Sequence, residues 1–244
     1  MPRVLRTLGT RTLPSQTNIN AAKTWILSRG WALTGAETAD ELAALNEAFE
    51  NTATFLAAMR EPLTPYWLVL LGVSGTGKTK LAKAISEYMT TFGEALYRRT
   101  VAPTLPEQSM KRVLLYAQSG PWLVPWREMC PFSDEARARM RTAQEDWFKV
   151  IDELKPETDT ENAGPKTFEA NAMGNLLDSR LGKWTVVTTN FRLKEIAKWD
   201  VRISSRLIRD GADVVDHGAF AVELVAALGL DSQRDLAAAR SHLH

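Results

Sequence analysis

Hydrophobic residues in the first sixty positions recur at helical spacing. Apolar positions between residues 18 and 30 lie on one helical face, and Gly30 stands where a helix would stop. Residues 38–41 read Thr-Ala-Asp-Glu, which fits a capping box, and apolar positions from 42 to 59 form one face of a second helix. The pattern therefore predicts two consecutive amphipathic helices.

Short apolar runs follow, and each of them predicts a strand. They lie at residues 66–71, 113–117, 147–151, 184–188 and 212–215. Helical stretches separate them, among them a charged segment that begins at Ser133, and residues 155–166 form a polar loop. This alternation predicts an α/β fold, in which a five-stranded parallel sheet is flanked by helices on both faces.

Composition narrows the class of protein only slightly. The chain has 244 residues, of which 45% are hydrophobic, so it can bury a core, and a disordered chain is excluded. Because 30 Lys and Arg balance 29 Asp and Glu, any contact with nucleic acid has to come from a local cluster of charge. A single cysteine, Cys130, excludes an internal disulfide, and no signal peptide or membrane-spanning apolar run is visible, which predicts a cytoplasmic protein.

A glycine-rich segment directly follows the first apolar run. Residues 72–79 read Gly-Val-Ser-Gly-Thr-Gly-Lys-Thr, which satisfies the pattern G-x-x-x-x-G-K-[ST] between a strand and a helix. Such a loop turns backbone N–H groups toward phosphate oxygens, so ATP is the expected cofactor, whereas a purely structural turn would need neither the lysine nor the hydroxyl. Lys78 is expected to reach the β and γ phosphates, and the Thr79 hydroxyl to bind Mg²⁺. The expected nucleotide contacts are Gly72, Ser74, Gly75, Thr76, Gly77, Lys78, Thr79 and Lys80.

Polar residues follow two later runs. Asp152 and Glu153 follow the third run, at the carboxyl end where ligands of a parallel sheet collect. We expect Asp152 to hold Mg²⁺, directly or through water, and Glu153 to polarise the water that attacks the γ-phosphorus; the alternative is a solvated pair of acids in a loop. Asn190 follows the fourth run and is expected to orient the same water, although capping of the next helix is the alternative.

Arg202 and Arg206 share one face of a predicted helix after the fourth run. Residues 72–79, residues 151–153, residues 188–190 and these two arginines occur in the order of the Walker A, Walker B, sensor 1 and arginine-finger motifs. The chain therefore resembles an AAA+ ATPase. Within that superfamily it looks most like helicase loaders of the DnaC/DnaI type, phage-encoded versions included, with IstB and DnaA as relatives. Residues 49–51, Phe-Glu-Asn, and residues 175–190 carry this closer resemblance.

The resemblance implies an ATPase domain in residues 46–244 without a full C-terminal lid, preceded by a basic arm and a small helical adaptor region in residues 1–45. It also implies a helical or ring oligomer, in which Arg206, or alternatively Arg202, reaches the γ-phosphate held by a neighbouring subunit. The expected function is ATP-dependent loading of a hexameric replicative helicase onto single-stranded DNA. An IstB-like transposition helper, a DnaA-like initiator, or an ATP-binding switch with little turnover are the alternatives.

Two segments keep alternative interpretations. Residues 119–127 match no part of the resemblance, and Trp122, Trp126 and Arg127 there could stack on single-stranded DNA, but burial of the tryptophans is favoured. The helices between residues 18 and 45 could dock on the helicase, which the resemblance favours, or could cover the ATPase core.

Overall fold

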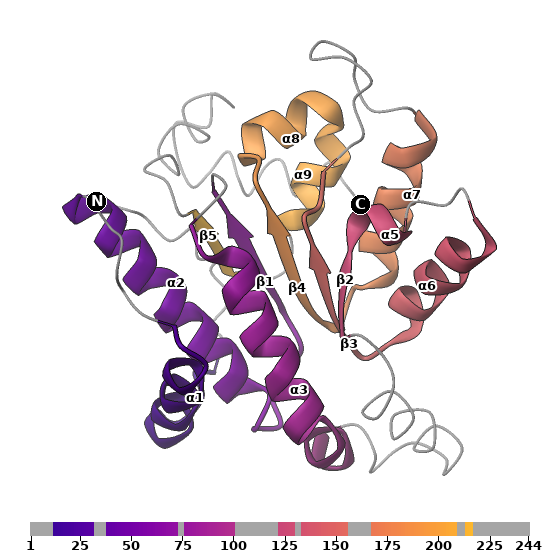
Figure 1. The fold of residues 1–244 in the computed structure, drawn as a ribbon. Helices are drawn as coiled ribbons and strands as arrows, with labels where there is room; N and C mark the ends of the chain where they lie inside the picture. Colours follow the sequence, from indigo (N-terminus) through magenta and orange to yellow (C-terminus); the bar gives the residue numbers. More distant parts are fainter. Residues whose placement is uncertain are drawn as a thin grey trace.

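The computed structural model describes residues 12–31, 38–72, 76–100, 122–129, 133–155, 167–208 and 213–216. Helices and strands alternate along them, in the order shown by the colours of Figure 1. They are α1 (Gln16–Ser28), α2 (Ala39–Ala58), β1 (Trp67–Leu71), α3 (Lys78–Thr100), β2 (Leu123–Pro125), α5 (Trp126–Met129), α6 (Asp134–Glu145), β3 (Phe148–Asp152), α7 (Thr167–Ser179), β4 (Trp184–Thr189), α8 (Leu193–Trp199), α9 (Val201–Leu207) and β5 (Asp213–Asp216).

The strands form one sheet with the order β2-β3-β4-β1-β5, and neighbouring strands run parallel. A mixed α/β fold with a parallel sheet flanked by helices is thus confirmed. Among the described residues, four of the strands expected from the sequence are found, and the expected strand at 113–117 lies outside these residues. The edge strand β2 occupies Leu123–Pro125 instead, where the apolar pattern predicted no strand.

The sheet separates two hydrophobic cores, because alternate residues of a strand point to opposite faces. Leu68 and Leu70 of β1 lie in the core shared with α1, α2 and α3. Trp67, Val69 and Leu71 lie in the core shared with α5 to α9. Figure 1 shows α1, α2 and α3 together on one side of the sheet and α6 and α7 on the other. The strands β1, β3 and β4 are buried along their whole length, as continuous apolar runs predict.

The first two helices pack inside this fold. Ala22 and Ile26 of α1 are fully buried in the same core as the sheet. The indole Nε1 of Trp25 donates a hydrogen bond to the Ala84 carbonyl oxygen of α3 at 3.2 Å. These apolar faces are used within the chain, which supports the covering interpretation of the helices, and the expected boundary after residue 45 falls within α2.

Two predicted helix starts are confirmed by their caps. The Thr38 hydroxyl accepts a hydrogen bond from the Glu41 N–H at 3.2 Å, and the Glu41 carboxylate accepts one from the Thr38 N–H at 3.2 Å, which is the expected capping box. Likewise the Ser133 hydroxyl accepts from the Ala136 N–H at 3.1 Å and caps α6. Among the described residues, no helix combines the length and the apolar character needed to cross a bilayer.

Arg180 is fully buried where β4 begins. Its guanidinium donates hydrogen bonds to the carbonyl oxygens of Ala143, Asp146 and Trp184 and to the Thr185 hydroxyl. Burial lowers the pKa of Arg180 to about 9, and the carboxylate of Asp146 opposes this effect. At neutral pH the arginine is therefore charged, and it ties β4 to the end of α6.

Candidate active site

The glycine-rich loop joins β1 to α3, as its sequence predicts. Gly72 and Gly77 have φ angles of 135° and 84°, in the region that favours glycine, and α3 begins at Lys78 directly after them. The expected contacts Ser74 and Gly75 lie outside the described residues. Lys80 is exposed on α3. A β-carbon at Gly77 would lie 2.7 Å from Cζ3 of Trp31, so this tryptophan from the end of α1 rests against the loop.

Lys78 is buried at the start of α3, with 5% of its surface exposed. Its ammonium donates hydrogen bonds to the Gly72 carbonyl oxygen at 2.7 Å and to the Thr76 hydroxyl at 3.1 Å. Burial lowers the pKa of Lys78, and the negative charges of Asp152 and Glu153 act in the opposite direction. The ammonium is thus a desolvated cation facing two carboxylates, and a bound anion would compensate for part of its lost hydration.

Asp152 connects this lysine-bearing loop to β3. Its side chain is buried, with 4% exposed, and its Oδ1 atom accepts hydrogen bonds from the Thr188 hydroxyl and, at 3.4 Å, from the Thr79 hydroxyl. The described residues contain no cluster of three His, Cys, Asp or Glu side chains that could hold a metal. Mg²⁺ does not need one, because it commonly binds one or two protein oxygens together with waters and substrate phosphates. Thr79 and Asp152 fit that chemistry.

Glu153 begins the turn after β3 in an unusual backbone conformation. Its φ is 53°, the one positive value among the non-glycine residues that the structure describes. Its N–H donates to the Thr188 hydroxyl at 2.9 Å, and the next N–H, of Leu154, donates to the Thr188 carbonyl oxygen at 2.8 Å. The Leu154 carbonyl oxygen in turn accepts from the Thr189 hydroxyl at 2.7 Å. The end of β4 therefore fixes the turn that carries Glu153, whose carboxylate accepts no hydrogen bond from another described residue.

Asn190 follows β4 directly and is exposed. Because β4 lies between β1 and β3, this residue leaves the sheet between the loop at Lys78 and the turn at Glu153. Its expected alternative use as a helix cap is not observed, since Arg192 occupies the N-cap position of α8. Asn190 makes no hydrogen bond within the described part of the chain.

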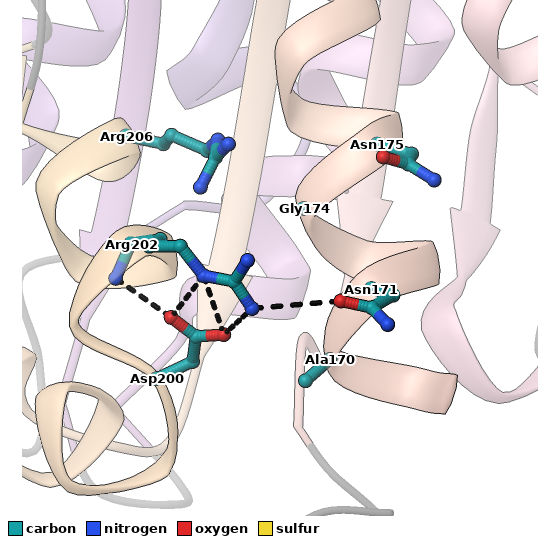
Figure 2. A pocket seen from close by; sticks show the side chains of 7 residues that line it. All are labelled: Ala170, Asn171, Gly174, Asn175, Asp200, Arg202 and Arg206. Carbon is teal, nitrogen blue, oxygen red and sulfur yellow. Dashed lines mark hydrogen bonds and ion pairs between the residues drawn. The ribbon is translucent and has the colours of Figure 1, made fainter. Parts of the chain in front are cut away.

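Both candidate arginine fingers line a small polar pocket between α7 and α9 (Figure 2). Arg202 Nε donates to Oδ1 and Oδ2 of Asp200 at 3.0 Å each, and its Nη2 lies 3.5 Å from Oδ1 of Asn171 across the pocket. The Arg202 side chain is 60% exposed. Arg202 is therefore a surface residue, and its carboxylate partner, Asp200, lies at the start of the same helix.

Arg206 is held more firmly. Its Nε and Nη2 atoms donate to the two carboxylate oxygens of Asp178 at 2.6 Å each, and its side chain is 19% exposed. These hydrogen bonds raise the pKa of Arg206. A β-carbon at Gly174 of α7 would lie 3.9 Å from this guanidinium. Ile203 and Leu207 are buried on the other side of α9, as the spacing predicted.

The structure thus brings together Lys78, Thr79 and Asp152, with Glu153 beside them, while Arg202 and Arg206 pair with carboxylates of α7 and α9. Trp122 and Trp126 are buried, with 2% and 1% exposed, which confirms the packing interpretation of this segment. Sequence analysis had assigned no individual role to Trp31, Asp178, Thr188 or Thr189, although the last three lie in segments that carried the resemblance. The polar end of the fourth apolar run was the available signal for the two threonines.

Comparison of the chain with protein-family models, with curated proteins and with solved structures finds no match.

Proposed function

We propose that this chain is a Mg²⁺-dependent ATPase of the P-loop type. One observation carries the proposal: a buried, desolvated lysine ammonium at the first position of a helix lies beside a buried carboxylate that shares a hydrogen bond with the next residue, Thr79. A triphosphate can bridge these groups, because its oxygens can bind both the lysine ammonium and a metal ion held by the hydroxyl of Thr79 and the buried carboxylate. A merely structural turn has no need of a buried lysine, whose burial is costly.

The proposed chemistry divides between the ends of three adjacent strands. Lys78, at the start of α3 after the loop that follows β1, binds the β and γ phosphates. Thr79 with Asp152 holds Mg²⁺, which neutralises charge that develops during phosphoryl transfer. Glu153 after β3 accepts a proton from the attacking water. Asn190 after β4 orients this water with a neutral amide.

We further propose that hydrolysis depends on assembly. Arg206, or alternatively Arg202, is supplied to the γ-phosphate of a neighbouring subunit in a helical or ring oligomer, where a guanidinium stabilises the transition-state charge. Both arginines lie on α9 and line one pocket, and their guanidinium groups are charged. The resemblance in motif order supports this assignment.

The cellular role proposed on the same resemblance is that of a replicative helicase loader that also binds single-stranded DNA. Because the apolar faces of α1 and α2 are used inside the fold, contact with a helicase would use other residues of the chain. An IstB-like helper or a DnaA-like initiator remains the alternative within the ATPases. Affinity capture from native lysate with and without ATP separates these, since recovery of a hexameric helicase supports loading and recovery of a transposase contradicts it.

The ATPase proposal is tested first by calorimetry with ATP and Mg²⁺. Wild-type protein is expected to bind, and Lys78→Ala to lose binding; Lys83→Ala, which removes an exposed lysine five residues further along α3, is the matched control. Absence of ATP binding by the folded wild-type protein would refute the proposal. Binding without turnover, even at high protein concentration and with DNA, would support the alternative of an ATP-binding switch.

Hydrolysis is then tested with Glu153→Gln, which keeps size and removes the proposed base. We expect retained ATP binding and a loss of turnover of at least about 100-fold. For the arginine, mixing Arg206→Ala with Lys78→Ala subunits is expected to restore part of the activity, because a mixed interface can combine an intact loop with an intact arginine. No recovery in the mixture, with assembly intact, would contradict action in trans.

A further inference from the structure

The side chain of Thr188 joins the two acidic residues of the candidate site. Thr188 lies in β4 with 1% of its surface exposed. Its hydroxyl donates a hydrogen bond to Oδ1 of Asp152 and accepts one from the N–H of Glu153 at 2.9 Å. A hydroxyl has a single proton, and a backbone N–H can only donate, so the direction of both bonds is fixed.

This hydroxyl acts where regular strand pairing stops. On one side, β4 continues to pair with β1 as far as Leu71 and Thr189. On the other side, its register with β3 ends at Ile151 and Val187, one residue before Asp152 and Thr188. Beyond that point the Thr188 side chain, not the backbone ladder, receives the Glu153 N–H. Thr188 is thus in register with Leu70 of β1, while its hydroxyl and its carbonyl oxygen both hold the acidic turn.

The backbone conformation of Glu153 requires hydrogen bonds of this kind if its side chain is to leave the sheet in one fixed direction. Its φ of 53° is a conformation that residues with a β-carbon adopt rarely. Three bonds from the end of β4 hold the turn: the Thr188 hydroxyl and carbonyl oxygen take the N–H groups of Glu153 and Leu154, and the Thr189 hydroxyl donates to the Leu154 carbonyl oxygen. Of the groups of β4 that make these bonds, the Thr188 hydroxyl alone also contacts the carboxylate of Asp152.

We propose that Thr188 is a positioning residue for ATP hydrolysis: its hydroxyl sets the orientation of the Asp152 carboxylate and the direction in which Glu153 leaves the sheet. This rests on the proposed function, in which Asp152 holds Mg²⁺ and Glu153 accepts the proton of water. Thr188 itself touches neither the nucleotide nor the water in this mechanism. Its loss therefore affects turnover more than it affects binding of the nucleotide, which depends on the loop at Lys78.

The experiment compares two substitutions that differ in the hydroxyl. Thr188→Val keeps the shape of the side chain and removes the hydroxyl, while Thr188→Ser keeps the hydroxyl and removes the methyl group. We expect Thr188→Val to lower kcat by about 10- to 100-fold, the usual range for partners that orient a metal ligand, with KM changed by less than about 3-fold. Thr188→Ser is expected to stay within about 3-fold of wild type in both parameters.

A control on the same strand separates positioning from a general effect on β4. Thr185→Val removes a buried hydroxyl that contacts Arg180 and the Lys183 carbonyl oxygen at the other end of the strand. It is expected to lower stability but not the kcat of the folded protein. Thr188→Ala serves as a second hydroxyl-free variant if Thr188→Val does not fold, and unfolding midpoints are measured for each variant.

The outcomes distinguish this inference from the function on which it rests. If wild-type protein neither binds nor hydrolyses ATP, the proposed function and the positioning role both fail. If wild type hydrolyses ATP and Thr188→Val matches it within about 2-fold, the positioning role alone fails. It also fails if Thr188→Ser is as impaired as Thr188→Val, because the hydroxyl would then not be the group that matters, or if kcat and ATP affinity fall together.

Discussion

Replacing Gly77 by alanine tests the packing of Trp31 against the glycine-rich loop. The new β-carbon would lie 2.7 Å from Cζ3 and 3.0 Å from Cη2 of Trp31, distances that such atoms do not adopt without movement. The indole has little room to move, because Trp31 is 6% exposed and belongs to the core under α1, α2 and α3. In addition, Gly77 has a φ of 84°, which alanine adopts only with strain.

The expected loss of stability in Gly77→Ala has two separable parts. The left-handed backbone contributes about 1–2 kcal/mol for a residue with a β-carbon. Overlap with a packed side chain contributes about 1–3 kcal/mol. Gly77→Ala is therefore expected to lower the free energy of unfolding by about 2–5 kcal/mol. Gly182→Ala is the matched control, because Gly182 has a φ of 69° but a β-carbon added there would meet nothing within 4 Å, so only the backbone part applies.

Urea unfolding of a double-mutant cycle measures the two parts. In a Trp31→Leu background the ring is gone, and Gly77→Ala is expected to cost only the backbone part, about 1–2 kcal/mol. The coupling between the two positions should then be about 1–3 kcal/mol. Equal costs in both backgrounds would refute the contact between Trp31 and Gly77. A cost of Gly77→Ala no larger than that of Gly182→Ala in the wild-type background would refute it as well.

Three further predictions concern charged groups. Arg180→Met is expected to lower the free energy of unfolding by about 3–5 kcal/mol in urea titrations, because three carbonyl oxygens lose their donor and the nearby carboxylate of Asp146 loses a favourable charge. A cost below about 1 kcal/mol would contradict this. Asp178→Asn is expected to cost about 1 kcal/mol or less in the same titrations, because its side chain is 41% exposed, and a cost as large as that of Arg180→Met would contradict this. ATP binding is expected to raise the lowered pKa of Lys78. Binding then takes up protons at pH values between the pKa of Lys78 in the free protein and the ordinary lysine pKa of 10.5. Calorimetry in buffers of different ionisation enthalpy measures this uptake, and its persistence in Lys78→Met would contradict the assignment.

Much of the fold could be predicted because periodicity in the sequence records burial. The runs that became β1, β3, β4 and β5 are apolar along most of their length, and strands covered by helices on both faces need such runs. The edge strand β2 was missed because it has three residues and includes Pro125, which lacks an N–H and is typical of sheet edges. Neither a period of two nor an apolar run can be recognised in so short a segment.

The candidate site could be predicted as far as residue types at strand ends allow. Asp152, Glu153 and Asn190 follow apolar runs, and parallel strands place their carboxyl ends at one edge, so their proximity was expected. The partners that orient these groups could not be predicted in the same way. Trp31 meets Gly77 across 46 residues of sequence, and no local pattern indicates which tryptophan rests on a loop. The pairing of distant side chains depends on the packing of α1, α7 and α9, which periodicity does not specify.

In the proposed mechanism, the residues at the strand ends are fixed more strongly by the fold than the arginines of α9, and this difference suits their roles. Asp152 and Thr188 are buried and bonded at the strand ends, so the groups around the nucleotide are fixed before it binds. Arg206 is tied instead to the partly exposed Asp178, and ion pairs of this kind contribute about 0–1 kcal/mol. A guanidinium at a transferred phosphoryl group accelerates the reaction by about 10³–10⁵, equivalent to about 4–7 kcal/mol. In the proposed oligomer, an exchange of Asp178 for a neighbouring phosphate would therefore cost far less than it contributes to the transition state, and it would leave the strand-end groups undisturbed.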